Sequence, residues 1–480
     1  GEKKFRHILD NSAIQSNELL AGALHGLLTN PNDIWFELTT GNIELDDDAE
    51  VKIWLQDSAR RIINVLNNTN FQTEVHEMYL DLGCFGTAPM LVEEDDEFVV
   101  RFHSQPISQV LIDENHLGQI DTIMREFEWD LRKIELEFGE DNLSEALLRA
   151  KQSNRYSEKK YEIIHAIYPD EDGSGFVSHY FLKKDKHTLR TGRFNEFPYV
   201  VPRWSKISGE MYGRSPGMVA LPEAKMINKM MEAVIKGAQK TVDPPLQAPS
   251  DGYILPIRTK PGSINFYMSG TGTRDEIKPI FNDARIDFGF QVMEAHRQRI
   301  RESFFVDQLQ LNQGPQMTAT EVLQRTEEKM RLLGPLLGRQ QSEFARPLIN
   351  RVFSVMIRRD MFMDIPTQLS GVNVDIQYSS FIAKTQRVNQ GNSILRAIQG
   401  AAPFIELDPS VADIFDGEEA VKELWRIYGA SQRLLRDPDE LEEMRAQRQE
   451  MQQRQMQQEQ QMADATIAKT EAEAQARQNQ

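Results

Sequence analysis

Apolar residues near the start of the chain recur with the spacing of an α-helix. Leu20, Leu24 and Leu28 follow one another at four-residue intervals, and Asn30-Pro31-Asn32 ends the segment. The same periodicity returns further along. We therefore predict three amphipathic helices, over residues 11–28, 51–65 and 71–82.

After Gly83 the pattern changes to short runs rich in β-branched and aromatic residues, separated by acidic or proline-containing turns. Such runs predict strands. They lie at residues 90–92, 98–102, 110–112, 120–127, 161–168 and 176–182, with helix-like stretches at 130–138 and 142–152 between them. Residues 85–205 are therefore predicted to form an α+β region.

Ser215-Pro216 begins a long helical stretch that reaches Thr241, because serine caps a helix and proline suits its first turn. Asp243-Pro244-Pro245 ends this stretch. A hairpin is predicted around Lys260-Pro261-Gly262, and residues 283–305 are helical again. Two long helices thus flank a small insertion that contains β-strands.

Residues 306–317 are predicted to be a polar loop. Thr318 and Glu321 then fit a capping box that starts a helical pattern running to about residue 363. Gly334-Pro335 and Arg346-Pro347 lie inside this pattern, so the helix should kink or break there. A strand over 372–378 and helices over 392–399 and 418–428 follow.

The last segment, residues 439–480, contains neither Gly nor Pro and is rich in Gln. It has few large apolar residues, so a helix formed there cannot bury itself alone. Either copies from several subunits associate, or the segment is a disordered Gln-rich tail. The sequence leaves both possibilities open.

Composition excludes several classes of protein. The chain has 480 residues, and its single cysteine, Cys84, cannot form an internal disulfide or a cysteine-based zinc site. No apolar stretch reaches the roughly 20 residues that span a bilayer. The first residue is Gly1 rather than Met, and we expect that an upstream segment is missing.

The formal net charge of −18 is unevenly distributed. Residues 1–150 carry 11 basic and 30 acidic side chains, whereas residues 151–480 carry 44 and 43. An acidic surface repels the phosphates of nucleic acid, so tight DNA binding is disfavoured. The acidity indicates either a solvated face that favours solubility or a wall that DNA passes without adhering.

Each candidate catalytic motif lacks a group that its chemistry requires. Gly213-Arg214-Ser215-Pro216-Gly217 matches the nucleophile elbow of hydrolases, but Pro216 lacks the N–H that would line the oxyanion hole. His76-Glu77 resembles the start of a zincin motif, yet Leu80 stands where the second histidine is needed. No phosphate-binding loop motif is present. We expect no catalytic residue, no metal and no cofactor, and hence a non-enzymatic assembly protein.

Six stretches, taken in order, resemble the portal, or head-to-tail connector, proteins of short-tailed bacteriophages. Each is weak alone, but their order and spacing are specific. They are Thr29-Asn30-Pro31-Asn32-Asp33-Ile34-Trp35-Phe36-Glu37-Leu38, Asp81-Leu82-Gly83-Cys84-Phe85-Gly86-Thr87-Ala88, Tyr212-Gly213-Arg214-Ser215-Pro216-Gly217, Asp243-Pro244-Pro245-Leu246, Phe304-Phe305-Val306-Asp307 and Met317-Thr318-Ala319-Thr320-Glu321-Val322.

The resemblance implies an α+β, mainly α, subunit that assembles as a ring at one vertex of the capsid. By analogy the chain divides into segments named after those of portal proteins. They are a wing (1–214), a first stem helix (215–242), a clip (243–282), a second stem helix (283–305), a channel loop (306–317), a long kinked helix (318–371), a wing or crown segment (372–438) and a C-terminal Gln-rich helical crown or barrel (439–480).

The same resemblance implies functional residues. The expected DNA-facing residues of the channel loop are Gln308, Gln310, Asn312, Gln313 and Gln316. The clip residues expected to dock the motor and the tail are Tyr253, Arg258, Lys260, Asn265, Tyr267 and Arg274. The expected stem residues are Lys229, Lys236, Arg297 and Arg301.

The expected partners are further copies of the chain, twelve in a ring, and double-stranded DNA that passes through the channel without sequence preference. The large terminase subunit, tail adaptor or tube proteins, and capsid and scaffolding proteins complete the set, with no membrane. The expected location is the virion, at the head–tail vertex, after assembly in the host cytoplasm. The alternatives are a non-viral homo-oligomeric helical ring or scaffold, and a serine hydrolase that uses Ser215.

Overall fold

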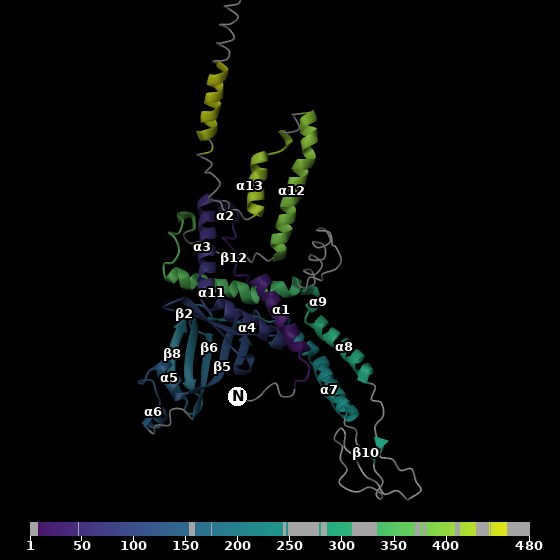
Figure 1. Ribbon diagram of the computed structural model, residues 1–480. Coiled ribbons are helices and arrows are strands. Elements are labelled where there is room, and N and C mark those ends of the chain that lie inside the picture. The colour runs from purple at the N-terminus through teal and green to yellow at the C-terminus, as the bar shows by residue number, and fades with distance from the viewer. Residues whose placement is uncertain are drawn as a thin grey trace, which may run out of the picture. The chain divides into compact units, whose positions relative to one another are not determined.

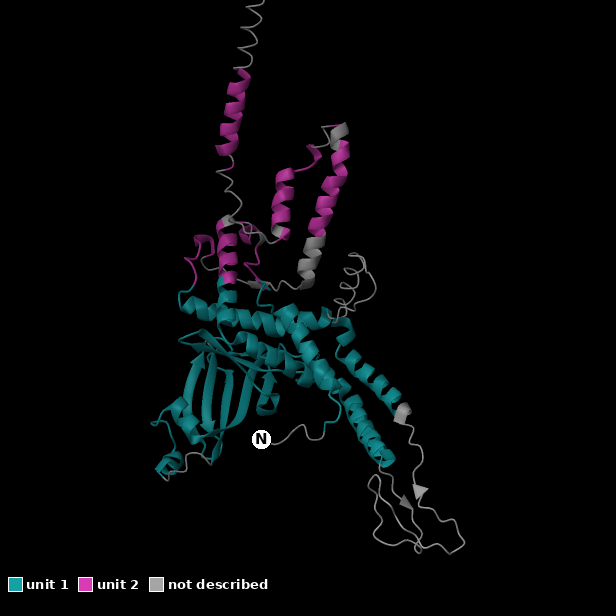
Figure 2. Cartoon of the chain, in the orientation of Figure 1, with its two compact units in different colours: residues 1–35, 61–361 teal, residues 36–60, 362–480 magenta. Residues whose placement is uncertain are grey.

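A computed structural model describes most of the chain (Figure 1). The described residues are 8–46, 48–152, 159–173, 175–242, 246–247, 278–279, 286–309, 334–369, 375–377, 381–408, 413–428, 441 and 443–457. The chain is mainly helical with β-sheets and divides into two compact units (Figure 2), residues 1–35 with 61–361 and residues 36–60 with 362–480. No helix among the described residues is long and apolar enough to cross a membrane.

The predicted opening helices are present as α1 (Ser12–Leu28), α3 (Ala49–Asn68) and α4 (Phe71–Phe85). In the first unit α1 packs against α4, with the Asn17 amide donating to the Leu80 carbonyl at 3.0 Å. α4 ends because Gly86 adopts the left-handed conformation, φ +78°, and its N–H closes the last turn. This end of α4 positions the segment that carries the buried ionic cluster described below.

Two antiparallel sheets form the α+β region of the first unit. A three-stranded sheet has the order β3-β2-β9, and a five-stranded sheet runs β4-β5-β6-β7-β8. The strands are β2 (Met90–Asp95), β3 (Val99–Ser104), β4 (Val110–Glu114), β5 (Ile120–Asp130), β6 (Lys160–Pro169), β7 (Phe176–Leu182), β8 (His187–Phe194) and β9 (Tyr199–Val200). All six predicted strands are confirmed; β8 and β9 had not been predicted.

The five-stranded sheet has a core on one face. Helices α5 (Leu131–Phe138) and α6 (Glu145–Gln152) supply apolar residues that pack on Phe127, Ile163 and Leu189 of the sheet. A short 3-10 helix, η1 (Ile107–Gln109), precedes β4. Because alternate strand residues point to one face, the period-two pattern places these side chains in a single buried layer.

Two long helices lie side by side in the first unit (Figure 1), as the sequence predicts. They are α7 (Pro216–Val242) and α8 (Ile286–Ser303). Beyond them the strands β10 (Leu246–Gln247) and β11 (Lys278–Pro279) pair antiparallel. The rest of the predicted insertion, including the hairpin around Lys260, lies outside the described residues.

The prediction of a polar loop over 306–317 is wrong at its start. Val306–Leu309 form one helical turn, α9, because Val306 is buried and the N–H groups of Gln308 and Leu309 donate back to the carbonyl of Phe305. Residues 310–317, and the capping box that begins at Thr318, lie outside the described residues.

The predicted kink near Arg346-Pro347 is present as a π-helical turn. Residues 334–340 are helical, η2 (Gln341–Ala345) is a π-turn, and α11 (Arg346–Arg358) continues. Pro347 has no N–H for an i→i−4 bond, and the wider turn accommodates this loss. The helix ends at Arg358 rather than near residue 363, since Asp360 takes a positive φ of 49°.

The second unit joins segments far apart in sequence. Strand β1 (Glu37–Thr39) pairs antiparallel with β12 (Asp375–Gln377), and the Trp54 indole donates to the Met363 carbonyl at 3.1 Å. This unit also contains α2 (Ile43–Asp46), η3 (Thr367–Leu369), α12 (Phe381–Leu407), α13 (Gly417–Ile427) and a helical segment at 443–457. α12 is much longer than the predicted 392–399. Of the Gln-rich end, residues 439–440, 442 and 458–480 lie outside the described residues.

Candidate functional site

The predicted stem residues on α7 are exposed and share one acid. The Nζ atoms of Lys229 and Lys236 lie 3.2 and 2.7 Å from the carboxylate of Glu232. Their side chains are 81% and 66% exposed, so water screens both contacts and each contributes little to stability. The two lysines therefore remain available to bind a further anion.

The predicted stem residues on α8 have a different role. Arg297 donates from Nε and Nη2 to one oxygen of Asp10, at 3.0 and 2.9 Å, and also pairs with Glu294. Arg301 pairs with the same Glu294. Burial would raise the pKa of Asp10, but bonds from Ser12 and Arg297 hold that pKa below its usual value. Arg297 thus fixes the start of α1 to the helix pair.

The structure tests few of the other predicted site residues. Gln308 lies in α9 and is half-buried, so it does not belong to an open loop. The other channel-loop residues, Gln310, Asn312, Gln313 and Gln316, lie outside the described residues. So do the six clip residues, Tyr253, Arg258, Lys260, Asn265, Tyr267 and Arg274.

Ser215 caps a helix. It is 1% exposed, its hydroxyl donates to the carbonyl of Cys84 at 2.7 Å, and it accepts from the N–H of Met218 at 2.9 Å. Those are the contacts of an N-cap residue, with Pro216 in the first turn. A hydroxyl so placed is unsuited to nucleophilic attack. Among the described residues no group of three or more His, Cys, Asp or Glu could hold a metal ion.

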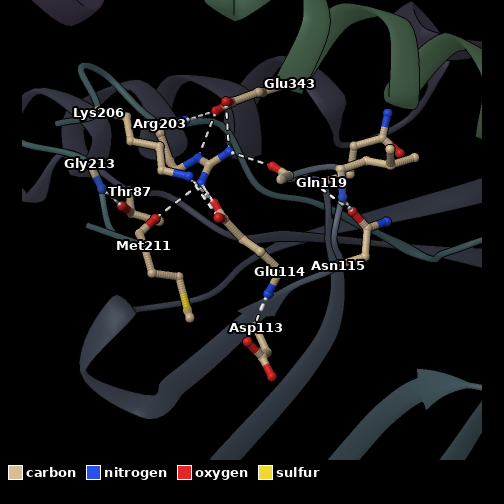
Figure 3. Close-up of polar contacts among 12 residues, drawn as sticks. Thr87, Asp113, Glu114, Asn115, Gln119, Arg203, Lys206, Met211, Gly213 and Glu343 are labelled. Carbon is tan, nitrogen blue, oxygen red and sulfur yellow. Dashed lines mark hydrogen bonds and ion pairs between the residues drawn. The ribbon is translucent and has the colours of Figure 1, made fainter. Parts of the chain in front are cut away.

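The most constrained polar site is a buried ionic cluster around Arg203 (Figure 3). Arg203 is 3% exposed and makes two parallel bonds to Glu343 of η2, Nε–Oε2 at 3.0 Å and Nη2–Oε1 at 2.8 Å. Its Nη1 donates to Glu114 at the end of β4 and to the Met211 carbonyl at 3.1 Å. One guanidinium thus joins the sheet, the 199–214 segment and the long helix.

Neighbouring groups complete this Arg203 cluster. Lys206 donates to both oxygens of Glu114, at 2.6 and 2.7 Å, and Arg339 donates to Glu343 at 2.8 Å. Burial would raise the pKa of Glu114, but the bonds from Lys206 and Arg203 lower it. The Gln340 amide donates to the Arg203 carbonyl at 3.0 Å. Each acid therefore has at least two cationic donors, which offsets the cost of burial.

The backbone next to the cluster is closely packed. The backbones of Thr87 and Arg203 form an isolated antiparallel β-bridge. The Gly213 N–H donates to the Thr87 hydroxyl at 2.8 Å. A Cβ on Gly213 would lie 2.1 Å from the Gly86 carbonyl oxygen, and one on Gly86 would lie 2.5 Å from the Gly213 oxygen. Only glycine allows this approach.

A second ionic group connects α11 with the three-stranded sheet. Arg351 is 2% exposed and pairs with Glu196 at 2.5 Å and Glu94 at 3.4 Å. Arg358, two turns on, pairs with the same two acids at 2.7 and 2.6 Å. With the Arg203 cluster, this group fixes both ends of the segment 339–358 against the α+β region.

Sequence reasoning missed both groups. Arg203 is 89 residues from Glu114 and 140 residues from Glu343. No local pattern marks such pairs. Both groups have a structural role, because each charge faces an opposite charge and neither group presents a free nucleophile or base.

Comparison with known proteins identifies what the chain is similar to. The sequence profile of a family described as "Bacteriophage head to tail connecting protein" matches residues 1–435. A "Probable portal protein" of Bordetella phage BPP-1 is 32% identical over 434 residues, which is 87% of this chain and 78% of that protein. A "Portal protein" of Salmonella phage epsilon15 is 29% identical over 492 residues, covering 99% of this chain and 88% of that protein.

Among solved structures, a chain of the "Neck of empty GTA particle computed with C6 symmetry" aligns with a TM-score of 0.40 and 12% sequence identity. That alignment covers 87% of this chain and 92% of the other chain.

Proposed function

Because the chain belongs to the family of bacteriophage head to tail connecting proteins, we propose that it forms the portal ring of a phage capsid. The family and the named relatives are structural connectors rather than enzymes. The observation that carries the proposal is the family match over residues 1–435, supported by two relatives called portal proteins. The chain acts as a channel for DNA packaging and ejection and as a platform for the terminase motor and the tail.

The segments take their places in this proposal. The α+β region is the wing, α7 and α8 are the stem, and the insertion 243–282 is the clip, with Tyr253, Arg258, Lys260, Asn265, Tyr267 and Arg274 as its docking residues. The paired helices with β10–β11 beyond them support this assignment. The segment after α9 is the channel loop, with Gln310, Asn312, Gln313 and Gln316 facing DNA. Gln308 is not included among these DNA-facing residues, because it lies in α9 and is half-buried.

Weak, sequence-independent contact suits this function. A channel with many unpaired cations would retain DNA, since each phosphate contact must be broken during translocation. In the stem, Arg297 and Arg301 are already neutralised by Asp10 and Glu294. We also propose twelve subunits, contact with capsid, scaffolding and tail adaptor proteins, assembly in the host cytoplasm, and an ATPase that resides in another protein.

The first experiment is imaging of the purified protein by negative stain, with native mass measurement. We expect rings of about twelve copies around a hole wide enough for a DNA duplex. A compact monomer or dimer at micromolar concentration would overturn the portal proposal. Purified rings should also hydrolyse no ATP.

A deletion separates the portal from a non-viral scaffold ring. Removing residues 243–281 should leave rings intact while abolishing terminase and tail docking, because the clip lies beyond the stem helices. If terminase or tail proteins still bind after the deletion, the clip assignment is wrong. Loss of the ring itself would also contradict that assignment. A serine hydrolase remains the alternative only if Ser215→Ala removes an esterase activity.

A further inference from the structure

One side of α7 carries a row of cations, here called the lysine stripe: Lys225, Lys229, Lys236 and Lys240. Their spacings of 4, 7 and 4 residues place them on one side of a helix with 3.6 residues per turn. All four are exposed, on the opposite side from the buried Ala220 and Ile227. One acid, Glu232, lies within the stripe, so its net charge is strongly positive.

α4 carries the opposite charge on its outer side. Glu77 and Asp81, here called the acidic pair, lie one turn apart, and neither has a cationic partner in the described part of the chain. Asp81 is half-buried. Burial, and then the charge of Glu77, raise the pKa of Asp81 to about 6. Within the part of one chain that the structure describes, this like-charged pair therefore has no counter-charge.

Apolar side chains accompany both charged surfaces. Phe85, at the end of α4, is 45% exposed, while Met218 and Met226 on α7 are 46% and 52% exposed. Charge alone in water gives a weak contact, but burial of these side chains in an interface would add affinity and exclude solvent from the charges. Both surfaces belong to the first unit (Figure 2).

We propose that the lysine stripe of one copy of this chain binds the acidic pair of α4 on the next copy. The inference rests on the proposed ring and names one of its contacts. Two different surfaces of opposite charge make a head-to-tail contact: within a pair, one copy keeps its acidic pair unused and the other keeps its lysine stripe unused, so further copies can add. Such contacts close into a ring when the rotation from copy to copy divides a full turn, whereas a two-fold dimer would use both surfaces of each copy and leave none for a further copy. DNA could bind the lysines but would leave the acidic pair without a partner.

Charge reversal tests the contact. We would compare Lys225→Glu/Lys229→Glu/Lys236→Glu, then Glu77→Lys/Asp81→Lys, then both sets combined, by native mass measurement. Each reversal alone should reduce the ring fraction at least tenfold, and the combination should restore it. Lys160→Glu/Lys183→Glu, at the start of β6 and just after β7, is the matched control and should form rings normally. Rings in both single reversals, or no recovery in the combination, would overturn the contact while leaving the ring proposal standing.

Chemical cross-linking tests the same contact without substitutions. A carbodiimide joins a carboxylate and an ammonium in contact by an amide bond, with loss of water. In mixed ¹⁴N and ¹⁵N rings, we expect mixed-isotope cross-links between peptides 74–88 and 225–240. Cross-links within single copies only, or their loss when DNA is removed, would overturn the proposal. Absence of any ring from the wild-type chain would instead refute the proposed function itself.

Discussion

The Arg203 cluster and the ion pairs around Glu232 have similar distances between nitrogen and carboxylate oxygen but differ in burial. Arg203 is 3% exposed and Lys229 is 81% exposed, although both approach carboxylates at about 3 Å. In the interior a charge cannot be solvated by water, so each member depends on all the others. On α7 water replaces a lost partner. The buried cluster therefore fixes the fold, while Lys229 and Lys236 can exchange Glu232 for another anion.

The largest expected effect comes from removing the centre of the buried cluster. Arg203→Met should destabilise the first unit by about 3–5 kcal/mol, because Glu343 and Glu114 lose their shared guanidinium. Urea unfolding monitored by tryptophan fluorescence measures this. Arg203→Lys should recover only part of the loss, since an ammonium cannot make the two parallel bonds. A loss below about 1 kcal/mol would contradict the comparison.

A smaller loss is expected at the second group. Arg351 is buried, but its partners Glu94 and Glu196 are 40% and 35% exposed, so water can solvate them when the arginine is gone. Arg351→Met should cost about 1–3 kcal/mol in the same urea experiment. Arg358→Met, with a more exposed guanidinium, is the matched control and should cost less. A larger loss of stability in Arg358→Met than in Arg351→Met would show that burial of the arginine does not determine these losses.

A buried neutral histidine extends the comparison to pH. His165 is 2% exposed, bonds Ser178 at 2.9 Å and stacks on Tyr180. Burial, with the charges of Arg125 and Arg190, lowers the pKa of His165 to about 3. The unfolded chain therefore binds a proton first as the pH falls below about 6.5, and stability is lost from there down to about pH 3.

The matching experiment replaces the histidine. Between pH 7 and pH 5, His165→Gln should remove about 1–2 kcal/mol of the wild-type loss of stability. Urea midpoints at both pH values measure it. His296 of α8, which lies against Glu223 of α7 rather than in the core of the sheet, is the control position. Equal pH dependence in the wild type and the His165 variant would refute this account.

The smallest effect is expected on α7. Glu232→Gln removes the acid shared by Lys229 and Lys236, yet the thermal unfolding midpoint should not change measurably, because water screens both exposed pairs. Thermal unfolding at low and high salt measures this. A clear drop in the midpoint at low salt would show that the exposed pairs contribute to the fold, which would remove the contrast with the Arg203 cluster.

The sequence predicts elements whose signals are local. Ser215-Pro216 marks the start of α7 because the capping contacts lie within three residues, and the six predicted strands follow from alternation over a few positions. Two-residue β9 is too short to show a period. Val306–Leu309 is predicted to be a loop because polar side chains dominate the segment, whereas it forms a helical turn with one buried valine.

Long-range partners cannot be predicted in this way. β1 pairs with β12, more than 330 residues away, so residues 36–60 belong to a different unit from their neighbours in sequence. Arg203 resembles any other arginine until Glu114 and Glu343 surround it. The expected stem residues illustrate both cases: Lys229 and Lys236 are exposed on a helix, as their spacing implies, whereas Arg297 bonds Asp10 far away.

The close approach of Gly86 and Gly213 limits how this sequence can vary. A substitution at either position places its first carbon against the other's carbonyl, so no second change at the facing position can make room. Gly86 also needs its positive φ. Random mutagenesis should therefore find these two sites intolerant of even alanine, however freely the lysines of α7 are exchanged.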